Sequence, residues 1–318
     1  MSSSPEQVCE GIDRLITLDV SGRGVIYKLY EAARGTSGKP LTLMASERIV
    51  ERVRKGDAVI IVTGFRVLPS GMQETDGPLG AASLSLALSR SLGARPVVVI
   101  ERESMEVMRA ALRSLGMSEA SSIDDLSSNS FMIRSFPYDF QEAEAEAEDM
   151  LSELSPSLIL AIEKVGRAAD GKYHTMRGFD VTELHVKIEP LFERAAARGI
   201  LTVGIGDGGN EVGMGNIREA VETHVPNGST IAAVSKVESL ICAAVSNWGG
   251  YGLSAALSLL TGEKNALHKA EEEERMLRAV TEAGAVDGIT GNRELSVDNI
   301  PLKVHESIVK ILEGFIKK

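Results

Sequence analysis

Short apolar runs recur along the chain, and a longer amphipathic stretch follows most of them. Most of these runs are continuously apolar rather than alternating, which is typical of strands in a sheet that is covered on both faces. On this pattern we predict six strands, at residues 58–63, 96–101, 130–134, 157–163, 200–206 and 230–235.

The stretches between these runs carry apolar residues at helical spacing. Pro78 and Gly93 bracket one of them, at the positions that proline and glycine favour around a helix. Helices are predicted at residues 79–92, 104–115, 140–154, 183–198, 239–261, 265–283 and 303–316. The alternation predicts an α/β fold: a doubly wound, mostly parallel sheet with helices on both faces and a helical C-terminal third.

No domain boundary is visible, so we expect a single domain over residues 1–318, with a helical part from about residue 239 packed on it. Residues 239–262 carry no charge and are long enough to cross a bilayer. The string NWGGYG at residues 247–252 interrupts this stretch. We therefore predict two buried segments joined by a glycine-rich turn, and no membrane span.

The composition narrows the class of protein. A net charge of −11 argues against nucleic acid as a partner, because a phosphate-binding face needs clustered Lys and Arg. Cys9 and Cys242 are the only cysteines, and two distant thiols form no disulfide framework or zinc spacing. The N-terminus has no secretory signal, so we expect a cytoplasmic protein. The sequence leaves its association into a homo-oligomer open.

Ligands of open α/β sheets bind beyond the carboxyl ends of the strands, so the residues that follow each strand are the candidates. Thr63 ends the first strand and Gly64 follows it, and the long connection from Gly64 carries Glu74 and Asp76 at a helix start. Asp76 alone is typical of a helix N-cap, but this explains neither Glu74 nor the length of the connection. Glu163 closes the fourth strand. We predict Glu74, Asp76 and Glu163 as catalytic residues.

Several cations, a tyrosine and a histidine follow Glu163 within residues 164–178. Arg167 and Arg177 are predicted to bind a carboxylate or phosphate in a bidentate manner. A surface network of ion pairs is the alternative explanation. We place Asp170 with these two arginines among the substrate-binding candidates.

The loop Gly204–Glu211 (GIGDGGNE) follows the fifth strand. Its glycines let backbone N–H groups approach a ligand closely. It formally matches G-x-G-x-x-G, but it lies late in the chain and its carboxylates would repel a pyrophosphate, so the dinucleotide interpretation is weak. We predict Asp207 and Glu211 as catalytic residues. Polar-site candidates for substrate binding are Gly208, Gly209, Asn210 and Asn247.

Other motifs are missing. The sequence has no G-x-x-x-x-G-K-[ST], no G-x-S-x-G and no His/Cys metal spacing, so no nucleotide cofactor is expected. A site rich in carboxylates suits acid–base chemistry on a small anionic substrate, with Mg²⁺ or Mn²⁺ as a candidate cofactor on oxygen ligands. The candidate metal ligands are Asp76, Asp207 and Glu211.

Five strings carry a resemblance to a known family: TGFRVLPSGMQETDGPLGA, AIEKVGRAADGKYHTMRGFD, VGIGDGGNEVGMGN, AVSNWGGYGLSAAL and AGAVDGITG. They resemble the C-terminal domain of the D-glutamate cyclase family, from about Ile12 to the C-terminus. The resemblance implies a lyase that cyclises D-glutamate to 5-oxo-D-proline with loss of water. The sequence departs from the animal enzyme in lacking its N-terminal domain, so we expect a stand-alone form. The resemblance also makes the segment Asp287–Gly291 a candidate part of the site.

The residues are compatible with this reaction. Ring closure is intramolecular, and effective molarities of roughly 10⁵ M or more make it compatible with the absence of an ATP-binding loop. Glu74, Glu163 or Glu211 is the candidate base, and Arg167, Arg177 or a metal would neutralise the substrate's carboxylates. The alternative is a non-catalytic regulatory module that binds a phosphate or nucleotide at Gly204–Gly215. We expect the three strand-end segments to converge.

Overall fold

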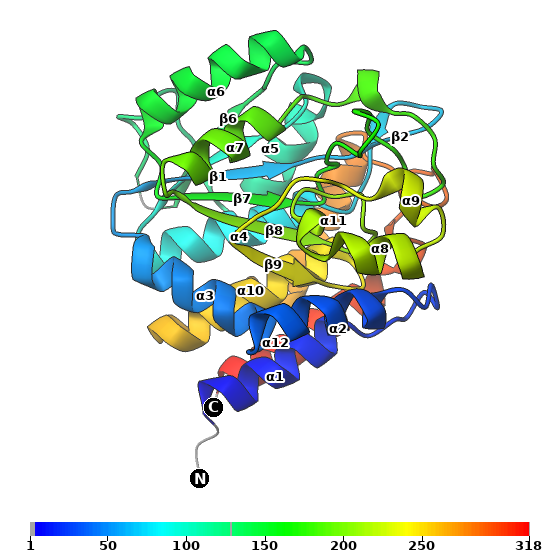
Figure 1. Cartoon of the computed structure of the whole chain (residues 1–318). Coiled ribbons are helices and arrows are strands. Elements are labelled where there is room, and N and C mark those ends of the chain that lie inside the picture. Colours follow the sequence, from blue (N-terminus) through cyan, green and yellow to red (C-terminus); the bar gives the residue numbers. More distant parts are fainter. Residues whose placement is uncertain (1–3, 128, 318) are drawn as a thin grey trace.

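A seven-stranded parallel sheet forms the centre of the computed structural model, which describes residues 4–127 and 129–317. Its strand order is β5-β6-β4-β1-β7-β8-β9 (Figure 1). The strands are β1 (Ala58–Thr63), β4 (Arg95–Val99), β5 (Ser118–Glu119), β6 (Ser130–Arg134), β7 (Leu158–Ile162), β8 (Leu201–Gly206) and β9 (Ser239–Cys242). The predicted α/β fold with a parallel sheet is confirmed.

The order of the strands reverses at β1. After β1 the chain forms β4 beside it, then the edge strand β5, and then β6 between these two, and it returns to place β7 on the other side of β1. The residues of β1, β7 and β8 are buried throughout, as their largely apolar sequences without charged residues predict. The crevice at such a reversal, beyond the carboxyl ends of the strands, is where sheets of this kind bind ligands.

Helices cover both faces of the sheet (Figure 1). In that view α6 and α7 lie above it, α3, α4 and α10 lie below it, and α1 and α12 form an outer layer beneath α10. The bounds are α1 (Pro5–Ile16), α2 (Ile26–Ser37), α3 (Leu41–Arg52), α4 (Pro78–Leu92), α5 (Met105–Ser114), α6 (Phe140–Leu154), α7 (Glu189–Ala197), α8 (Arg218–His224), α9 (Gly228–Ile231), α10 (Ser246–Thr261), α11 (Ala270–Glu282) and α12 (Leu302–Ile316).

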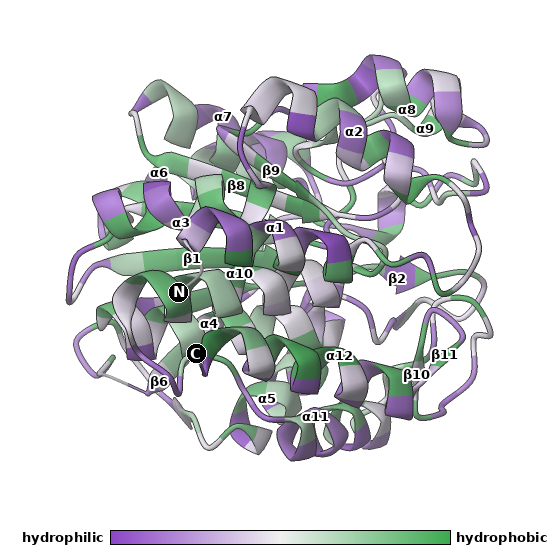
Figure 2. Ribbon diagram, turned by 90° about the horizontal axis from the view of Figure 1, so that it is seen from below, coloured by the Kyte–Doolittle hydropathy of each residue, from purple (hydrophilic) through white to green (hydrophobic). Residues whose placement is uncertain are grey.

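Several small elements lie outside the central sheet. They are two hairpins, β2 (Arg66–Val67) with β3 (Met72–Gln73) and β10 (Ser296–Val297) with β11 (Ile300–Pro301), and three single 3-10 turns at Arg102–Ser104, Thr182–Leu184 and Met214–Ile217. Figure 2 shows β1 hydrophobic along its length, whereas α1 has both hydrophilic and hydrophobic segments. This is the pattern of a strand buried on both faces and a helix with one buried face.

The predicted strand at residues 230–235 is wrong. Its first residues end α9, and the backbone N–H groups of Ala233 and Val234 donate to Gly209 and Arg167 in the neighbouring loops, at 3.1 and 2.9 Å. The run is therefore apolar because loops bury it, and the sheet instead gains β9 from the next apolar run.

The predicted helix at 239–261 begins only at Ser246, because residues 239–242 form β9. The predicted turn at residues 247–252 is also wrong, since these residues are the first turns of α10. Helices predicted from residues 183 and 265 begin at Glu189 and Ala270. Among the described residues, no helix is both long and apolar enough to cross a membrane.

Candidate active site

A cavity of about 480 Å³ opens beyond the carboxyl ends of β1, β7 and β8. It lies where the order of the strands reverses, which is the expected place for a ligand. Its size is within the range of small-molecule sites. It is lined by Arg23, Phe65, Val67, Leu68, Pro69, Glu74, Asp76, Glu163, Thr175, Met176, Arg177, Phe179, Asp207, Asn210, Gly288, Ile289, Thr290, Gly291 and Asp298.

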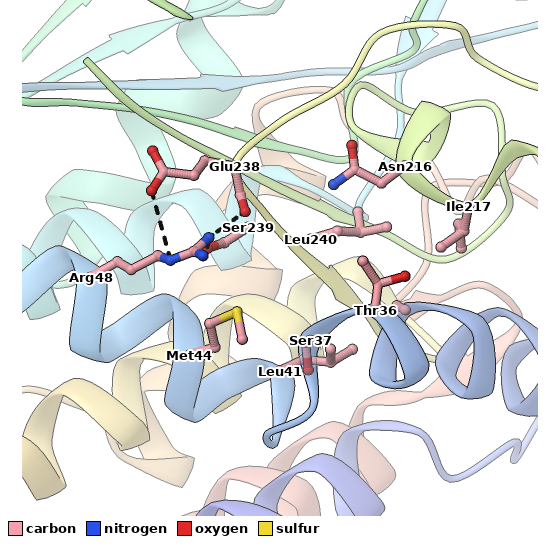
Figure 3. Close-up of a pocket in the computed structure, with 11 residues that line it drawn as sticks. Thr36, Ser37, Leu41, Met44, Arg48, Asn216, Ile217, Glu238, Ser239 and Leu240 are labelled. Atoms are coloured by element: carbon pink, nitrogen blue, oxygen red, sulfur yellow. Dashed lines mark hydrogen bonds and ion pairs between the residues drawn. The ribbon is translucent and has the colours of Figure 1, made fainter. Parts of the chain in front are cut away.

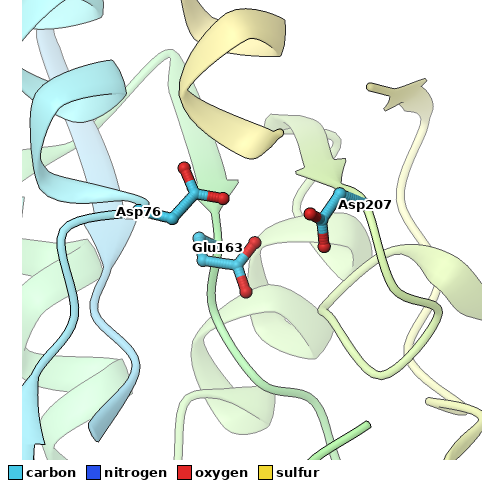
Figure 4. Close-up of side chains that lie close together, drawn as sticks. All are labelled: Asp76, Glu163 and Asp207. Carbon is cyan, nitrogen blue, oxygen red and sulfur yellow. The ribbon is translucent and has the colours of Figure 1, made fainter. Parts of the chain in front are cut away.

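Three carboxylates meet on the floor of this cavity (Figure 4). Asp76 precedes α4, Glu163 follows β7 and Asp207 follows β8. All three are buried, and each offers one oxygen within 4.8 Å of the others. The sequence predicted the three residues separately as catalytic, and the fold brings them together.

The start of α10 holds the Asp76 carboxylate in place. The oxygens of this carboxylate accept hydrogen bonds from the backbone N–H groups of Gly77, Ser246 and Asn247 at 3.0, 2.9 and 2.8 Å. The Asn247 side chain in turn accepts from the N–H groups of Gly77 and Gly80 at 2.9 and 2.7 Å, and donates to the Thr75 carbonyl. Asn247, predicted to bind substrate, therefore joins α4 to α10 and does not line the cavity.

Glu163 has a backbone conformation that is rare for a residue with a side chain. Its φ is 44°, in the left-handed region, which costs about 1–3 kcal/mol. One carboxylate oxygen accepts a short hydrogen bond from the Ser246 hydroxyl. Strain of this kind persists where the surroundings fix it, and it is enriched at functional sites.

A second group of carboxylates comes from the C-terminal part of the chain. Asp298 lies in the two-residue turn of the β10–β11 hairpin, where both central residues have positive φ, 53° at Asp298 and 60° at Asn299. The buried carboxylate of Asp287 holds this hairpin, accepting from the Ser296 hydroxyl at 2.6 Å and the Asn299 N–H at 2.7 Å. Asp298 thereby reaches the cavity that Glu74 also lines.

Arg23 is a site residue that the sequence did not reveal. It lies in the connection between α1 and α2, and its guanidinium forms an ion pair with Asp207. It also donates to the Ala244 carbonyl at 2.6 Å and lies 3.7 Å from the Asp298 carboxylate. No strand-end rule points to a connection between two helices, so only its charge could have drawn attention to it.

Simultaneous ionisation of all the carboxyl groups in the cavity is unfavourable. Burial raises the pKa of Glu74, Glu163 and Asp298 well above their usual values, and the negative charge of neighbouring carboxylates adds to this. Burial, together with the charge of Asp207, raises the pKa of Asp76 to about 7. The site therefore favours uptake of protons or of a cation.

A divalent metal fits the cluster of Asp76, Glu163 and Asp207. Carboxylate oxygens are the ligands of Mg²⁺ and Mn²⁺, and a cation would relieve the repulsion that raises the pKa of Asp76 and Glu163. Of the ligands predicted from the sequence, Asp76 and Asp207 belong to this set. Glu211 does not, and Glu163 takes its place.

Glu211 instead folds the glycine-rich loop. Its carboxylate accepts the backbone N–H groups of Asp207, Gly208 and Gly209 at 2.9, 2.6 and 2.7 Å. The loop turns back over β8 so closely that a Cβ at Gly204 would lie 2.6 Å from the Val212 carbonyl oxygen. Gly208, Gly209 and Glu211 therefore shape the wall that presents Asp207, and they do not line the cavity.

The remaining candidates divide into two groups. Arg177 and Asn210 line the cavity, and the Asn210 amide donates to the His174 carbonyl at 2.8 Å. Arg167 lies outside, stacked over the Phe140 ring at 5.1 Å. The other candidates outside the lining are the exposed Asp170, which pairs with the buried His174, and the buried residues Thr63 and Gly64.

A second, smaller hollow of about 120 Å³ lies at the amino end of β9, between α2 and α3 (Figure 3). Arg48 spans it, with its guanidinium 3.7 Å from Glu238 and 2.9 Å from the Ser239 hydroxyl. Its lining includes apolar side chains such as Met44 and Leu240 and carries no group of converging carboxylates. The cavity of about 480 Å³, in which the carboxylates of Asp76, Glu163 and Asp207 meet, is therefore the candidate active site.

Comparison with known proteins shows the family to which this chain belongs. Residues 12–313 match the family described as D-glutamate cyclase-like, C-terminal, so the chain belongs to that family. It is 27% identical over 345 residues to the mitochondrial D-glutamate cyclase of Homo sapiens. That alignment covers 98% of this chain and 52% of the human protein, so the chain spans about half the length of this relative.

Solved structures add little. An actinorhodin polyketide ketoreductase with NADPH aligns over 83% of this chain and 92% of its own, at 11% identity and a TM-score of 0.32. A ribonuclease from Caenorhabditis elegans aligns over 84% and 93%, at 9% identity and a TM-score of 0.25. Scores this low carry no argument about fold or function.

Proposed function

We propose that this chain catalyses the cyclisation of D-glutamate to 5-oxo-D-proline with release of water. One observation carries the proposal: Asp76, Glu163 and Asp207 converge in a cavity at the carboxyl edge of the sheet, in a chain that belongs to the D-glutamate cyclase-like family. The human relative, whose name states this substrate, supports the choice of D-glutamate.

The reaction defines what the side chains must do. The α-nitrogen bonds to the γ-carboxyl carbon, one carbon–oxygen bond breaks, and two protons from the α-ammonium leave with that oxygen as water. The enzyme therefore has to accept a proton from nitrogen, neutralise the γ-carboxylate and protonate the departing oxygen.

The residues of the cavity divide these tasks. Glu74 has a pKa raised well above its usual value by burial and neighbouring charge, so it keeps its proton to higher pH than a free carboxyl and serves as the donor to the departing oxygen. Asp207 is the acceptor of the ammonium proton. Arg177 and Arg23 line the same cavity and bind the substrate's carboxylates.

Asp76, Glu163 and Asp207 would hold a Mn²⁺ or Mg²⁺ ion. When bound, the ion supplies positive charge that offsets the γ-carboxylate and the charge that develops on its oxygen. The backbone groups around Asp76, from Gly77, Ser246 and Asn247, keep that carboxylate oriented toward the cluster.

A regulatory module that binds phosphate at the glycine-rich loop has less support. The N–H groups of Asp207, Gly208 and Gly209, which would have to cradle a phosphate, all donate to Glu211. Releasing them would leave a buried carboxylate without partners.

The test is incubation of the purified chain with D-glutamate and, separately, L-glutamate, with and without Mn²⁺, followed by detection of 5-oxoproline by mass spectrometry. Formation of 5-oxoproline from D-glutamate in excess of the uncatalysed rate supports the proposal. No product from D-glutamate under either condition contradicts it.

A further inference from the structure

Three large apolar side chains stand exposed around the mouth of the cavity. Leu68, Phe179 and Ile289 are 45%, 58% and 50% exposed, and all three line the cavity. They come from three separate loops: the β2–β3 hairpin, the segment after β7 and the segment that precedes β10. We call these three residues the apolar rim. Exposed apolar groups that gather from separate loops are typical of a binding surface.

The apolar rim continues inward. Val67 and Phe65 are buried, Met176 is half-buried, and all three line the same cavity as the rim and the carboxylates. The apolar lining of this cavity therefore includes buried side chains as well as the exposed ones of the rim. This shape fits a group of the bound small molecule better than the surface of a second protein.

The cavity is also larger than D-glutamate requires. About 480 Å³ is a volume that holds drug-sized ligands, and a single amino acid at the carboxylate floor would leave the apolar rim without contact. Its lining holds five carboxylates, from Glu74, Asp76, Glu163, Asp207 and Asp298, against the two guanidinium groups of Arg23 and Arg177. A substrate without net charge meets less repulsion here than D-glutamate, which carries one net negative charge.

From these observations we propose that the site also accepts γ-amides of D-glutamate with apolar amines, the apolar group lying against Leu68, Phe179 and Ile289. The inference rests on the proposed cyclisation and names a wider substrate class for the same site. The amide is zwitterionic, keeps the α-carboxylate for an arginine, and presents an apolar group toward the rim.

The step uses the same attack and a different leaving group. The α-nitrogen bonds to the γ-carbonyl carbon, the carbon–nitrogen bond to the apolar amine breaks, and the two protons lost by the α-ammonium end on that amine. The products are 5-oxo-D-proline and the ammonium form of the amine, so atoms and charge balance without any co-reactant. A substituent on the α-carboxyl would instead remove the carboxylate that Arg177 or Arg23 is placed to bind.

The test compares the γ-benzylamide of D-glutamate with its γ-methylamide, using D-glutamate as the reference substrate. The two amides share the reacting centre and differ in apolar surface. We expect the benzylamide to be converted with a kcat/KM about tenfold or more above that of the methylamide, mainly through KM. The variants Phe179→Ser and Ile289→Ser should each reduce this ratio several-fold.

Ile311→Ser is the matched control, because Ile311 is 49% exposed on α12 and does not line the cavity. Its benzylamide-to-methylamide ratio should equal that of the wild type. Conversion of D-glutamate without conversion of either amide overturns this inference and leaves the proposed function intact. Equal ratios in the wild type and both rim variants also overturn it. If neither D-glutamate nor the amides react, the proposed function fails and this inference with it.

Discussion

Arg23 and Asp207 are 184 residues apart in the sequence and form an ion pair in the wall of the cavity. The charge of Asp207 is the main cause that raises the pKa of Arg23 above its usual value, so the guanidinium stays charged. It lies among carboxyl groups whose pKa values are raised by burial and by the charge of neighbouring carboxylates, that of Asp76 to about 7. Arg23 therefore supplies positive charge where the proposed substrate brings carboxylates.

Replacing Arg23 with methionine should lower kcat/KM for D-glutamate about 100-fold, because the variant loses a preorganised positive charge. The same change removes a cation beside the carboxylate cluster, so Mn²⁺ should bind more tightly in calorimetric titration. Arg14→Met is the control, since Arg14 makes only an exposed pair with Glu10. Turnover at the wild-type rate in Arg23→Met would rule out a role for this residue in the reaction.

The raised pKa of Glu74 leads to a prediction about how the stability of the fold depends on pH. Burial and neighbouring negative charge raise this pKa above the unfolded value, so folding takes up a proton and stability is lost as pH rises above about 4.5. Glu74→Gln removes that loss. The difference in free energy of unfolding between Glu74→Gln and wild type should grow in favour of the variant from pH 5 to pH 8, by up to about 1.4 kcal/mol per pH unit.

This difference can be measured by urea denaturation at several pH values. A difference that stays constant with pH would show that Glu74 does not gain a proton on folding. The same variant should lose about 100-fold in kcat, because a glutamine cannot donate a proton to the departing oxygen.

Gly288 controls the position of the Glu74 carboxylate. A Cβ at Gly288 would lie 2.2 Å from a Glu74 oxygen, so Gly288→Ala must displace that side chain. We expect at least a tenfold loss of kcat with the fold retained. Gly314→Ala in α12 is the matched control, because nothing lies within 4 Å of its Cβ; it should keep full activity and gain about 1 kcal/mol of stability. Equal activity of both variants would contradict this placement of Glu74.

Glu211 should act through the loop and not on the substrate. In Glu211→Gln, an amide NH₂ must face one of the N–H groups that now donate to the carboxylate, so we expect a loss of about 2 kcal/mol in stability together with reduced turnover. Thermal denaturation and kinetics measure the two effects. Loss of activity at unchanged stability would instead assign Glu211 a direct catalytic role.

Much of the fold follows from local pattern. The buried strands β1, β6, β7 and β8 were predicted within one residue, because their apolar runs lie between clear turn signals. The run at residues 230–235 was wrongly predicted as a strand, because burial by loops and burial in a sheet produce the same apolar pattern. The glycines of α10 were wrongly predicted to form a turn, because glycine also allows close packing between helices. At Gly250 a Cβ would lie 3.0 Å from the Cα of Gly80.

The floor of the site was accessible from sequence because Asp76, Glu163 and Asp207 belong to segments that meet at one edge of a parallel sheet. Arg23 and Asp298 reach the cavity from a helix connection and a hairpin turn, and their positions depend on packing over long sequence separations. The position of Arg167 and Glu211 outside the cavity lining could not be predicted from the sequence either. Which way a side chain points depends on its partners, here the Phe140 ring and three backbone N–H groups.

The most direct test of the catalytic role of the carboxylate cluster is the kcat/KM for D-glutamate of wild type and Glu163→Gln in the presence of Mn²⁺. Glu153→Gln serves as control, since Glu153 pairs with Arg134 at the surface. We predict 5-oxo-D-proline formation by wild type and control at equal rates, and a loss of at least 100-fold in Glu163→Gln with its circular dichroism spectrum unchanged. Wild-type turnover by Glu163→Gln, or no product from wild type, would contradict the account.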